Sequence, residues 1–337
     1  MTQASKLAAA VRQTAGLFEL PQRQVIEVRG SDRVRWLNGM LSNDIAALEV
    51  NGPNSGCYAL LLTRQGRIVA DLQVLAQPDV FWLDVESAAA EATISSLEKF
   101  IVADDVELVR RPTISRLGLE GPNSRRILDS AAPRGFPDLA PNGCAEIELA
   151  GVSGLVAAFG WSGEVSFQFF FEAAGGAPEA FRSALSECGS GLGMLAGSLQ
   201  ALEILRVEAG VPRFGSELDE GVLPAEARLE RAISTTKGCY TGQEVVERMR
   251  ARGRVGHLLV GLRTAGTPPE PGMRLTAAAG GSASVGEVTS VCRSDLAGPI
   301  ALGFVRVAHA EPGNRVYFGA ASTEVVELPF VAPSSVS

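Results

Sequence analysis

The sequence predicts an α+β portion followed by a small all-β barrel, and two observations carry this prediction. Before residue 250, apolar strand-like runs alternate with stretches whose apolar residues recur at helical spacing, which is typical of α+β layers. After Gly253, short strands follow one another at steady spacing between Gly and Pro turns, as in a small barrel. Because single cores stop growing near ~250 to 300 residues, a chain of 337 residues is expected to hold more than one domain.

The first α+β unit is expected at residues 1–112. A short amphipathic helix at 4–14 opens it, a second helix ends near Ser42, and a third spans 88–100. The order of strands and helices favours a mostly antiparallel sheet with helices on one face. The expected strands are LFEL, VIEVRG, GCYALLLT, RIVADLQVL, FWLDVE and DDVELVR.

A second unit of similar size is expected at residues 113–250, because strand, helix, three strands and helix follow again. Its last helix spans 198–209 and ends at a glycine, which commonly terminates helices. The preceding glycine series, GSGLGMLAG, resembles a phosphate-binding loop but follows a helix, so we expect a helix-to-helix connection there. The barrel is expected at residues 251–331, and residues 332–337 are expected to form a flexible tail.

Charge and composition exclude several classes of function. A formal net charge of −8 repels polyphosphate at long range, so no direct contact with nucleic acid is expected. No apolar run approaches the ~20 residues that span a bilayer, and the amino terminus lacks a secretion signal, so we expect a cytoplasmic protein without membrane contact. The five cysteines are scattered and only two histidines are present, so we expect free thiols and no metal site.

Glu208 lies at the carboxyl end of the helix at 198–209, where the helix dipole disfavours a negative charge by roughly 0.3 to 1 kcal/mol. Arg206 or solvent could compensate this charge. Alternatively, a ligand with a row of N–H donors, such as the edge of a pterin, could bind the carboxylate in bidentate fashion. The residues alone leave both interpretations open.

Cys239 lies in the segment KGCYTGQE, between Gly238 and Gly242, which allow close approach of other groups to the backbone. The neighbouring Lys237 could favour the thiolate, and a thiolate is the nucleophilic form of cysteine. Free cysteines are usually buried, however, so an inert thiol in a tight turn is the alternative.

Four arginines alternate at positions 248, 250, 252 and 254. On an extended strand this period would place all four guanidinium groups on one face, where they would need anions. Glu244 and Glu247 could supply these anions in a solvated ribbon of ion pairs. The functional alternative is a carboxylate-bearing ligand tail or an acidic partner surface, which suit the planar fork of arginine.

Residues 206–255 resemble the signature region of YgfZ-type folate-binding proteins, which are relatives of the glycine cleavage T-protein, an aminomethyltransferase. The segment KGCYTGQE is the most specific part and resembles the YgfZ branch more than the T-protein branch. The resemblance extends to WLNGMLSNDI, TRQGRIVADL and VGEVTSV, and so covers nearly the whole chain.

The resemblance implies a T-protein-like fold, in which ferredoxin-like α+β subdomains form a folate-binding portion and a β-barrel follows. It also implies tetrahydrofolate in a central cavity and a role in assembling or maintaining iron–sulfur enzymes, including radical enzymes that thiolate tRNA. Cys239 corresponds to the motif cysteine, and Cys239 and Lys237 are the candidate catalytic residues. The candidate folate-binding residues are Glu208, Asp71, Asn43, Tyr240, Gln243, Glu244, Arg248 and Arg250.

One departure from the T-protein pattern bears on the reaction. The T-protein pattern has two successive acidic residues at the positions that correspond to Ala70 and Asp71 in this chain. Alanine cannot orient an amine or transfer a proton. The leading hypothesis is therefore a monomeric, tetrahydrofolate-binding accessory protein whose partners are iron–sulfur client proteins. The alternative is a folate-dependent aminomethyltransferase, and a third interpretation is a scaffold with a vestigial cavity.

Overall fold

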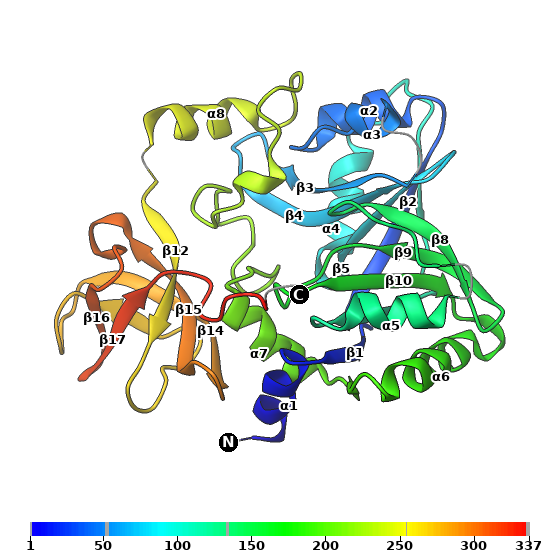
Figure 1. The fold of residues 1–337 in the computed structure, drawn as a ribbon. Coiled ribbons are helices and arrows are strands. Elements are labelled where there is room, and N and C mark those ends of the chain that lie inside the picture. Colours follow the sequence, from blue (N-terminus) through cyan, green and yellow to red (C-terminus); the bar gives the residue numbers. More distant parts are fainter. Residues whose placement is uncertain (1, 51–53, 133–134, 254, 335–337) are drawn as a thin grey trace.

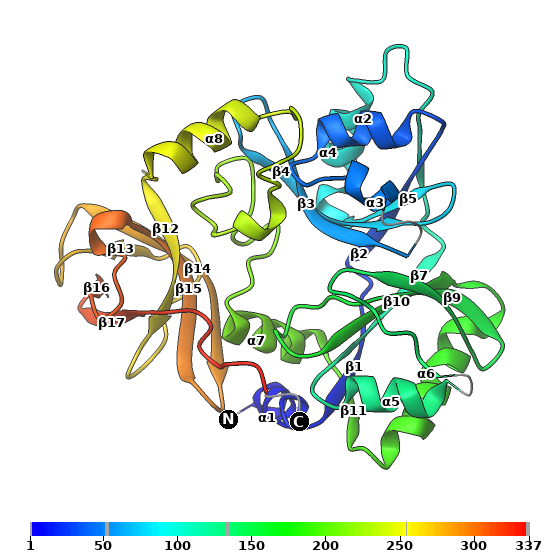
Figure 2. The same cartoon turned by 45° about the horizontal axis from the view of Figure 1, so that its top comes forward.

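The structure is a computed structural model that describes residues 2–50, 54–132, 135–253 and 255–334. Within these ranges the chain forms two sheets, each with helices on one face, and a closed barrel (Figure 1). The two sheets lie on one side of the molecule and the barrel on the other, with α7 (Leu199–Ala209) between them (Figure 2). The predicted α+β portion with a carboxyl-terminal all-β barrel is confirmed.

The first sheet has five antiparallel strands, and its helices cover one face only. Side chains alternate along each strand, so every second residue, such as Leu72 and Val74, packs under the helices and the others point to the opposite, inner face. In spatial order the strands are β3 (Gly56–Leu62), β4 (Ile68–Ala76), β5 (Phe81–Glu86), β2 (Arg23–Arg29) and β6 (Glu107–Arg110). The covering helices are α2 (Arg33–Met40), α3 (Ala46–Val50) and α4 (Ser87–Glu98).

The second sheet has six strands and includes one from the beginning of the chain. The strand expected beside Arg23–Arg29 in the first unit, β1 (Ala15–Glu19), instead pairs with β7 and β11 of this sheet. The glycine series also differs from expectation, because part of it forms the short parallel strand β11 (Met194–Ala196). The remaining strands are β7 (Ile114–Glu120), β10 (Ser166–Glu172), β9 (Val152–Ala157) and β8 (Cys144–Leu149), and the covering helices are α5 (Ser124–Ala131) and α6 (Ala177–Ser190).

The inner faces of the two sheets pack against each other. Val25 and Leu75 of the first sheet share a buried cluster with Leu155 and Phe170 of the second. The ring of Trp82 lies 6.0 Å from that of Phe170 between their centroids. Polar side chains of the first sheet lie beside this cluster, and the site described below begins there.

The barrel is closed by six strands and has a core of its own. Helices α1 (Gln3–Val11) and α7 pack against its side in a separate cluster that includes Val11, Leu205 and Leu302. The strands, in order around the barrel, are β12 (His257–Arg263), β15 (Gly298–Arg306), β14 (Ser284–Ser294), β13 (Arg274–Thr276), β16 (Arg315–Phe318) and β17 (Ala321–Val326). Short 3-10 turns occur at Ala174–Gly176, Glu230–Ala232 and Val307–His309.

The segment after the barrel returns to the α+β portion. Ser334, expected to belong to a flexible tail, donates its backbone N–H to Glu164 at 2.9 Å and its hydroxyl to the carbonyl of Arg12 at 2.9 Å. These bonds hold the described part of the tail in place, and residues 335–337 lie outside the described residues. Across the described ranges, no helix combines the length and apolar character needed to cross a membrane.

Candidate functional site

Part of the inner face of the first sheet is polar. Alternation along β3, β4, β5 and β2 places polar side chains there, among them Tyr58, Asp71, Asp84, Glu86 and Arg23. Arg23 lies opposite Glu86 in the ladder, and the register of β4 and β5 places Asp71 beside Glu86. These groups are buried or half-buried, so each needs a partner in the protein or in a ligand.

Only one of the two carboxylate oxygens of Asp71 has a hydrogen-bond partner among the described residues. Its Oδ2 accepts a hydrogen bond from the Tyr58 hydroxyl at 3.0 Å, whereas Oδ1 is buried without a partner among the described residues. Burial raises the pKa of Asp71, and burial also raises the pKa of Tyr58 well above its usual value. Arg231 lies over the ring of Tyr58, 5.3 Å from its centroid, and forms no ion pair with a described residue. Among the described residues, Asp71 thus has a free acceptor, and Arg231, over the neighbouring Tyr58, is a cation without an ion pair.

Ala70 points the other way. It is fully buried among the residues packed under α2 and α4, and so lies on the helix-covered face of the sheet. An acid at this position would enter the apolar core and not the inner face. An acid at position 70 would therefore not lie beside the Asp71 carboxylate. The alanine at this position is no longer an argument against aminomethyl transfer.

A cavity of about 150 Å³ lies between the two sheets and α7. Glu203 projects into it from α7 and pairs with Arg206 and Arg213. Burial raises the pKa of Glu86, and the Oε1 atom of Gln22 is buried without a partner in the described residues. The lining residues are Gln22, Glu86, Trp161, Leu199, Leu202, Glu203, Arg206 and Arg213. We call this the central cavity.

Sequence reasoning missed Glu203, although a signal for it exists. Leu199, Leu202, Glu203 and Arg206 are spaced i, i+3, i+4 and i+7, which is one face of a helix. An acidic and a basic residue on an otherwise apolar helix face indicate that this face lines a polar cavity.

Glu208 lies on a different side of α7. Its carboxylate accepts from Arg12 Nε at 2.6 Å and from the Ser294 hydroxyl, and the residue is 1 % exposed. Arg12 also binds Glu164 at 2.8 Å, so one guanidinium lies between two acids. Arg12, and not the expected Arg206 or solvent, therefore compensates the charge of Glu208. A pterin could bind this carboxylate directly only by replacing these partners, and Glu208 does not line the central cavity.

Lys237 closes the end of helix α2. Its ammonium donates to the backbone carbonyls of Asn38, Leu41 and Asn43 at 2.5 to 2.7 Å, which uses all three of its N–H groups. The carbonyls of Asn38 and Leu41 belong to the carboxyl end of the helix, where a cation is favoured, and that of Asn43 follows just after it. Burial nevertheless lowers the pKa of Lys237 to about 8. Its hydrogen bonds go to the backbone, so none is left for the thiol of Cys239.

Cys239 is exposed, whereas the other four cysteines of the chain are buried or half-buried. The segment that carries it is held against the first sheet on both sides. Tyr240 packs with Leu60 and Leu62, and its buried hydroxyl has no partner among the described residues. Gly242 has a φ of +84°, and an added Cβ would lie 2.6 Å from the carbonyl oxygen of Thr63. Glycine is thus required where this segment meets the β3–β4 hairpin.

The arginine series does not form the expected extended strand. Helix α8 spans Gln243–Arg252, so Arg248 and Arg250 point in different directions around it. Arg248 pairs with Glu244 and Arg250 pairs with Glu247, all on the helix surface. Arg254 lies outside the described residues, as does the side chain of Arg252. The ion-paired, solvated alternative is the one that fits Arg248 and Arg250.

Asn43 joins the motif segment to the site indirectly. Its amide Nδ2 donates to the carbonyl of Tyr58 at 2.8 Å and to that of Arg231 at 3.5 Å. It therefore holds Arg231 and Tyr58 next to each other through their backbones. Gln243, another expected folate ligand, starts helix α8 and has no described contact with Asp71.

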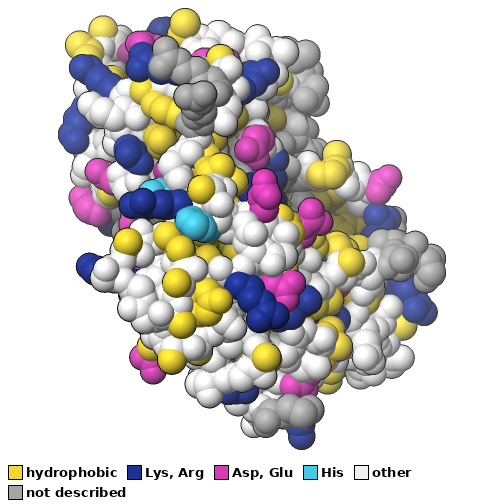
Figure 3. Space-filling view, turned by 90° about the vertical axis from the view of Figure 1, so that its left-hand side faces the viewer, with side chains coloured by type: hydrophobic (Ala, Val, Ile, Leu, Met, Phe, Trp, Pro, Cys, Tyr) yellow, Lys and Arg dark blue, Asp and Glu magenta, His cyan; other side chains and the backbone are white. Residues whose placement is uncertain are grey.

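No group of three or more His, Cys, Asp or Glu side chains in the described ranges could hold a metal ion. Figure 3 shows the barrel side of the molecule, where the two histidine side chains lie near basic and acidic groups on the surface. Neither histidine lines the central cavity.

Two family models match the chain in succession. The GCVT N-terminal domain matches residues 3–237, and the glycine cleavage T-protein C-terminal barrel domain matches residues 258–332. The chain belongs to the glycine cleavage T-protein family. The first match covers both sheets and the motif segment up to Lys237, and the second covers the barrel.

Named relatives of the T-protein family agree with these matches. The chain is 31% identical to an aminomethyltransferase of Streptomyces coelicolor, over 95% of this chain and 87% of the relative. It is 34% identical to an aminomethyltransferase of Anoxybacillus flavithermus, over 72% of this chain and 66% of the relative. The crystal structure of the glycine cleavage aminomethyltransferase T of Bartonella henselae has the same fold, with a TM-score of 0.85, 24% identity, and coverage of 98% of this chain and 90% of that one.

The T-protein family is thus shown, while the narrower YgfZ-type branch rests on the KGCYTGQE segment alone. The relatives are named for aminomethyl transfer, which was the alternative function expected from the sequence. The choice between these functions depends on what the inner face of the first sheet can do.

Proposed function

We propose that the protein binds tetrahydrofolate at the inner face of the first sheet and exchanges a one-carbon unit beside Asp71. The observation that carries this proposal is the free, buried Oδ1 of Asp71. Gln22 and Gln73 also have buried amide oxygens without partners among the described residues. Unpartnered buried acceptors are costly, so a ligand that brings several N–H donors would gain affinity here. The reduced pterin ring of tetrahydrofolate is such a ligand.

The reaction that the relatives favour is aminomethyl transfer. In that reaction the folate nitrogens bond to the methylene carbon, the carbon–sulfur bond to the carrier breaks, and ammonia leaves. The products are methylenetetrahydrofolate, the free carrier thiol and ammonia. Asp71 would hold the reacting nitrogen and take up its proton, for which a carboxyl group with a raised pKa is suited. Tyr58 would keep the carboxylate turned so that Oδ1 faces the ligand.

Arg231 is our candidate for the negatively charged glutamate end of the folate. It is exposed, stacks over Tyr58 and forms no ion pair with a described residue, whereas Arg248 and Arg250 are already paired on α8. A guanidinium group binds carboxylates through its planar fork. We assign the role of the pterin-binding acid to Glu203, because Glu203 lines the central cavity and Glu208 does not.

A second candidate function is support of iron–sulfur client enzymes, with folate bound and Cys239 at the surface. One observation favours it, which is that Cys239 alone among the five cysteines is exposed. An exposed thiol on a braced segment is accessible to a partner protein. Thiol exchange, transient metal contact and attack on a one-carbon adduct are its candidate reactions.

One experiment separates the two candidates. The purified protein is mixed with tetrahydrofolate and an aminomethylated lipoyl carrier, and methylenetetrahydrofolate and ammonia are measured together. Stoichiometric formation of both, and its loss in Asp71→Asn, would support aminomethyl transfer. Folate binding without turnover, together with reduced iron–sulfur enzyme activities in cells that carry Cys239→Ala, would support the second candidate.

A further inference from the structure

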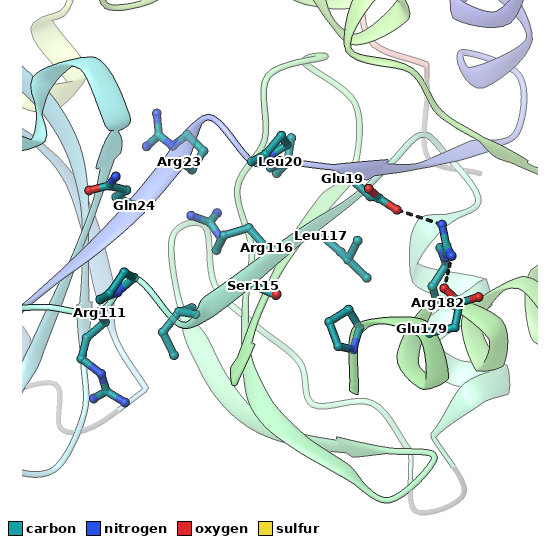
Figure 4. A pocket seen from close by; sticks show the side chains of 14 residues that line it. Glu19, Leu20, Arg23, Gln24, Arg111, Ser115, Arg116, Leu117, Glu179 and Arg182 are labelled. Atoms are coloured by element: carbon teal, nitrogen blue, oxygen red, sulfur yellow. Dashed lines mark hydrogen bonds and ion pairs between the residues drawn. The ribbon is translucent and has the colours of Figure 1, made fainter. Parts of the chain in front are cut away.

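A second cavity, of about 350 Å³, lies where the two sheets meet and shares no lining residue with the central cavity. The two connections between the sheets pass beside it, one through Pro21 and the other through Pro112. The start of β7 and the first turns of α6 complete its wall (Figure 4). We call it the junction cavity. Its lining residues are Glu19, Leu20, Pro21, Arg23, Gln24, Arg111, Pro112, Ile114, Ser115, Arg116, Leu117, Pro178, Glu179 and Arg182.

Positive charge exceeds negative charge along this wall. The wall carries four arginines and two glutamates, and both glutamates are paired with Arg182. The acidic partners of the other three arginines do not line the cavity. Figure 4 shows the arginine side chains approaching from both sides, with Arg23 and Arg116 on one side and Arg182 on the other. The arrangement therefore favours an anionic ligand over a cationic one.

Arg116 is buried in the cavity wall and has N–H donors without acceptors among the described residues. Its side chain is 1% exposed and lies over the ring of Phe170, 3.7 Å from the centroid. One nitrogen, Nη1, donates to Asp84, while Nε and Nη2 are buried and have no partner among the described residues. Asp84 is shared, because Arg23 donates to it as well, at 2.8 Å.

Two buried arginines therefore depend on one carboxylate for their closest contact. Burial, with the neighbouring charge of Arg23 as a further contribution, lowers the pKa of Arg116 to about 10. Stacking on Phe170 satisfies the face of the guanidinium group but not the N–H donors at its edge. A buried charged group with unused donors is destabilising unless something accepts from them.

We propose that the junction cavity binds a small organic anion, through a carboxylate or phosphate group that accepts from Arg116 and is held at the rim by Arg111 and Arg182. Both head groups match the fork of arginine in two-point contact. The prolines and the leucines of the wall give the anion an apolar surface for a short carbon body. The site does not depend on the proposed folate function, because the two cavities have separate walls.

Binding is tested by calorimetric titration of the full chain with inorganic phosphate and, separately, with succinate. We expect saturable one-to-one binding of at least one of them and a rise in melting temperature with its concentration, because the anion binds only the folded state. Arg116→Gln should weaken that binding at least about tenfold. Arg182→Gln should weaken it severalfold, since it also frees Glu19 and Glu179 to repel the anion.

Two controls keep the outcome clear. Arg125→Gln changes an arginine of α5 that is about as exposed as Arg182 and pairs with Asp129 and Asp138, and it should leave anion binding unchanged. Arg182 is on the surface, so its variant reports on the site even where Arg116→Gln fails to fold. The absence of saturable binding of both anions would overturn the proposal and would mean that water alone meets Arg116. Binding that persists at full strength in both the Arg116 and the Arg182 variants would also overturn it.

Discussion

The hydroxyl of Tyr58 lies 3.0 Å from Oδ2 of Asp71, and this contact leaves Oδ1 of the same carboxylate buried and unpartnered. The two residues sit on adjacent strands of the first sheet, on the face without helices. A carboxylate held in this way is ready for a ligand but costs the free protein stability. Removing the charge of this carboxylate should therefore stabilise the free protein and weaken ligand binding.

Asp71→Asn is expected to stabilise the free protein at pH 7 by roughly 1 kcal/mol, because it removes the charge of a buried carboxylate. The folded-state pKa of Asp71 is raised, so the native state holds this proton more tightly than the unfolded chain does. Wild-type stability should therefore fall as pH rises from the unfolded value near 3.8 to the higher folded value, and the variant should lack this contribution. Urea unfolding from pH 4 to 8 measures it, and a variant less stable than wild type at pH 7 would contradict it.

Lys237→Met is expected to reduce the free energy of unfolding by about 2 to 3 kcal/mol. Three carbonyls at and just after the end of α2 lose their donor, and methionine cannot replace it. Chemical denaturation of Lys237→Met beside Lys99→Met, a change at an exposed lysine, measures the difference. Equal stability of the two variants would show that Lys237 does not brace this helix end.

Glu208→Gln is expected to cost about 3 kcal/mol of stability, since it breaks a buried ion pair with Arg12. In protein that remains folded, its affinity for tetrahydrofolate should stay within about twofold of wild type. Glu203→Gln should do the reverse, with a small loss of stability and an affinity about fivefold lower. Melting curves and titrations on both variants test the pair. A large affinity loss in Glu208→Gln alone would restore Glu208 as the ligand.

Arg231→Gln is expected to weaken tetrahydrofolate about tenfold while leaving a reduced pterin without a glutamate tail unaffected. The reason is that Arg231 has no carboxylate partner of its own among the described residues. Arg248→Gln, at an arginine already paired with Glu244, is the matched control and should change neither affinity. Equal losses for both ligands would mean that Arg231 supports the pterin end or the fold.

Much of the fold follows from patterns within the sequence. Alternation along Ile68–Ala76 and helical spacing along Leu199–Ala209 predict a strand and a helix that the structure contains. The pairing of β1 with the second sheet could not be read in this way, because its seven-residue neighbour β2 is joined to it by a short turn that looks like a hairpin. The alternating arginines suggested an extended strand, but the structure has helix α8 there, with a glycine at each end.

The site was harder to predict, because residues that contact each other in it are far apart in the sequence. Asp71 and Asn43 stand near each other in the chain, and both were expected at the site. The partner of Glu208 is Arg12, 196 residues away, and nothing near Glu208 in the sequence points to it. Lys237 was expected to act on the nearby Cys239, whereas its hydrogen bonds go to the end of α2, almost 200 residues earlier. Local spacing cannot reveal contacts of this kind.

The central claim is that Asp71 binds tetrahydrofolate, and calorimetric titration of wild type and Asp71→Asn tests it most directly. The account predicts saturable one-to-one binding to wild type and an affinity at least about tenfold lower in the variant. The variant's folded state is verified by its melting curve in the same buffer. Equal affinity of the two proteins, or no binding to wild type, would contradict the account.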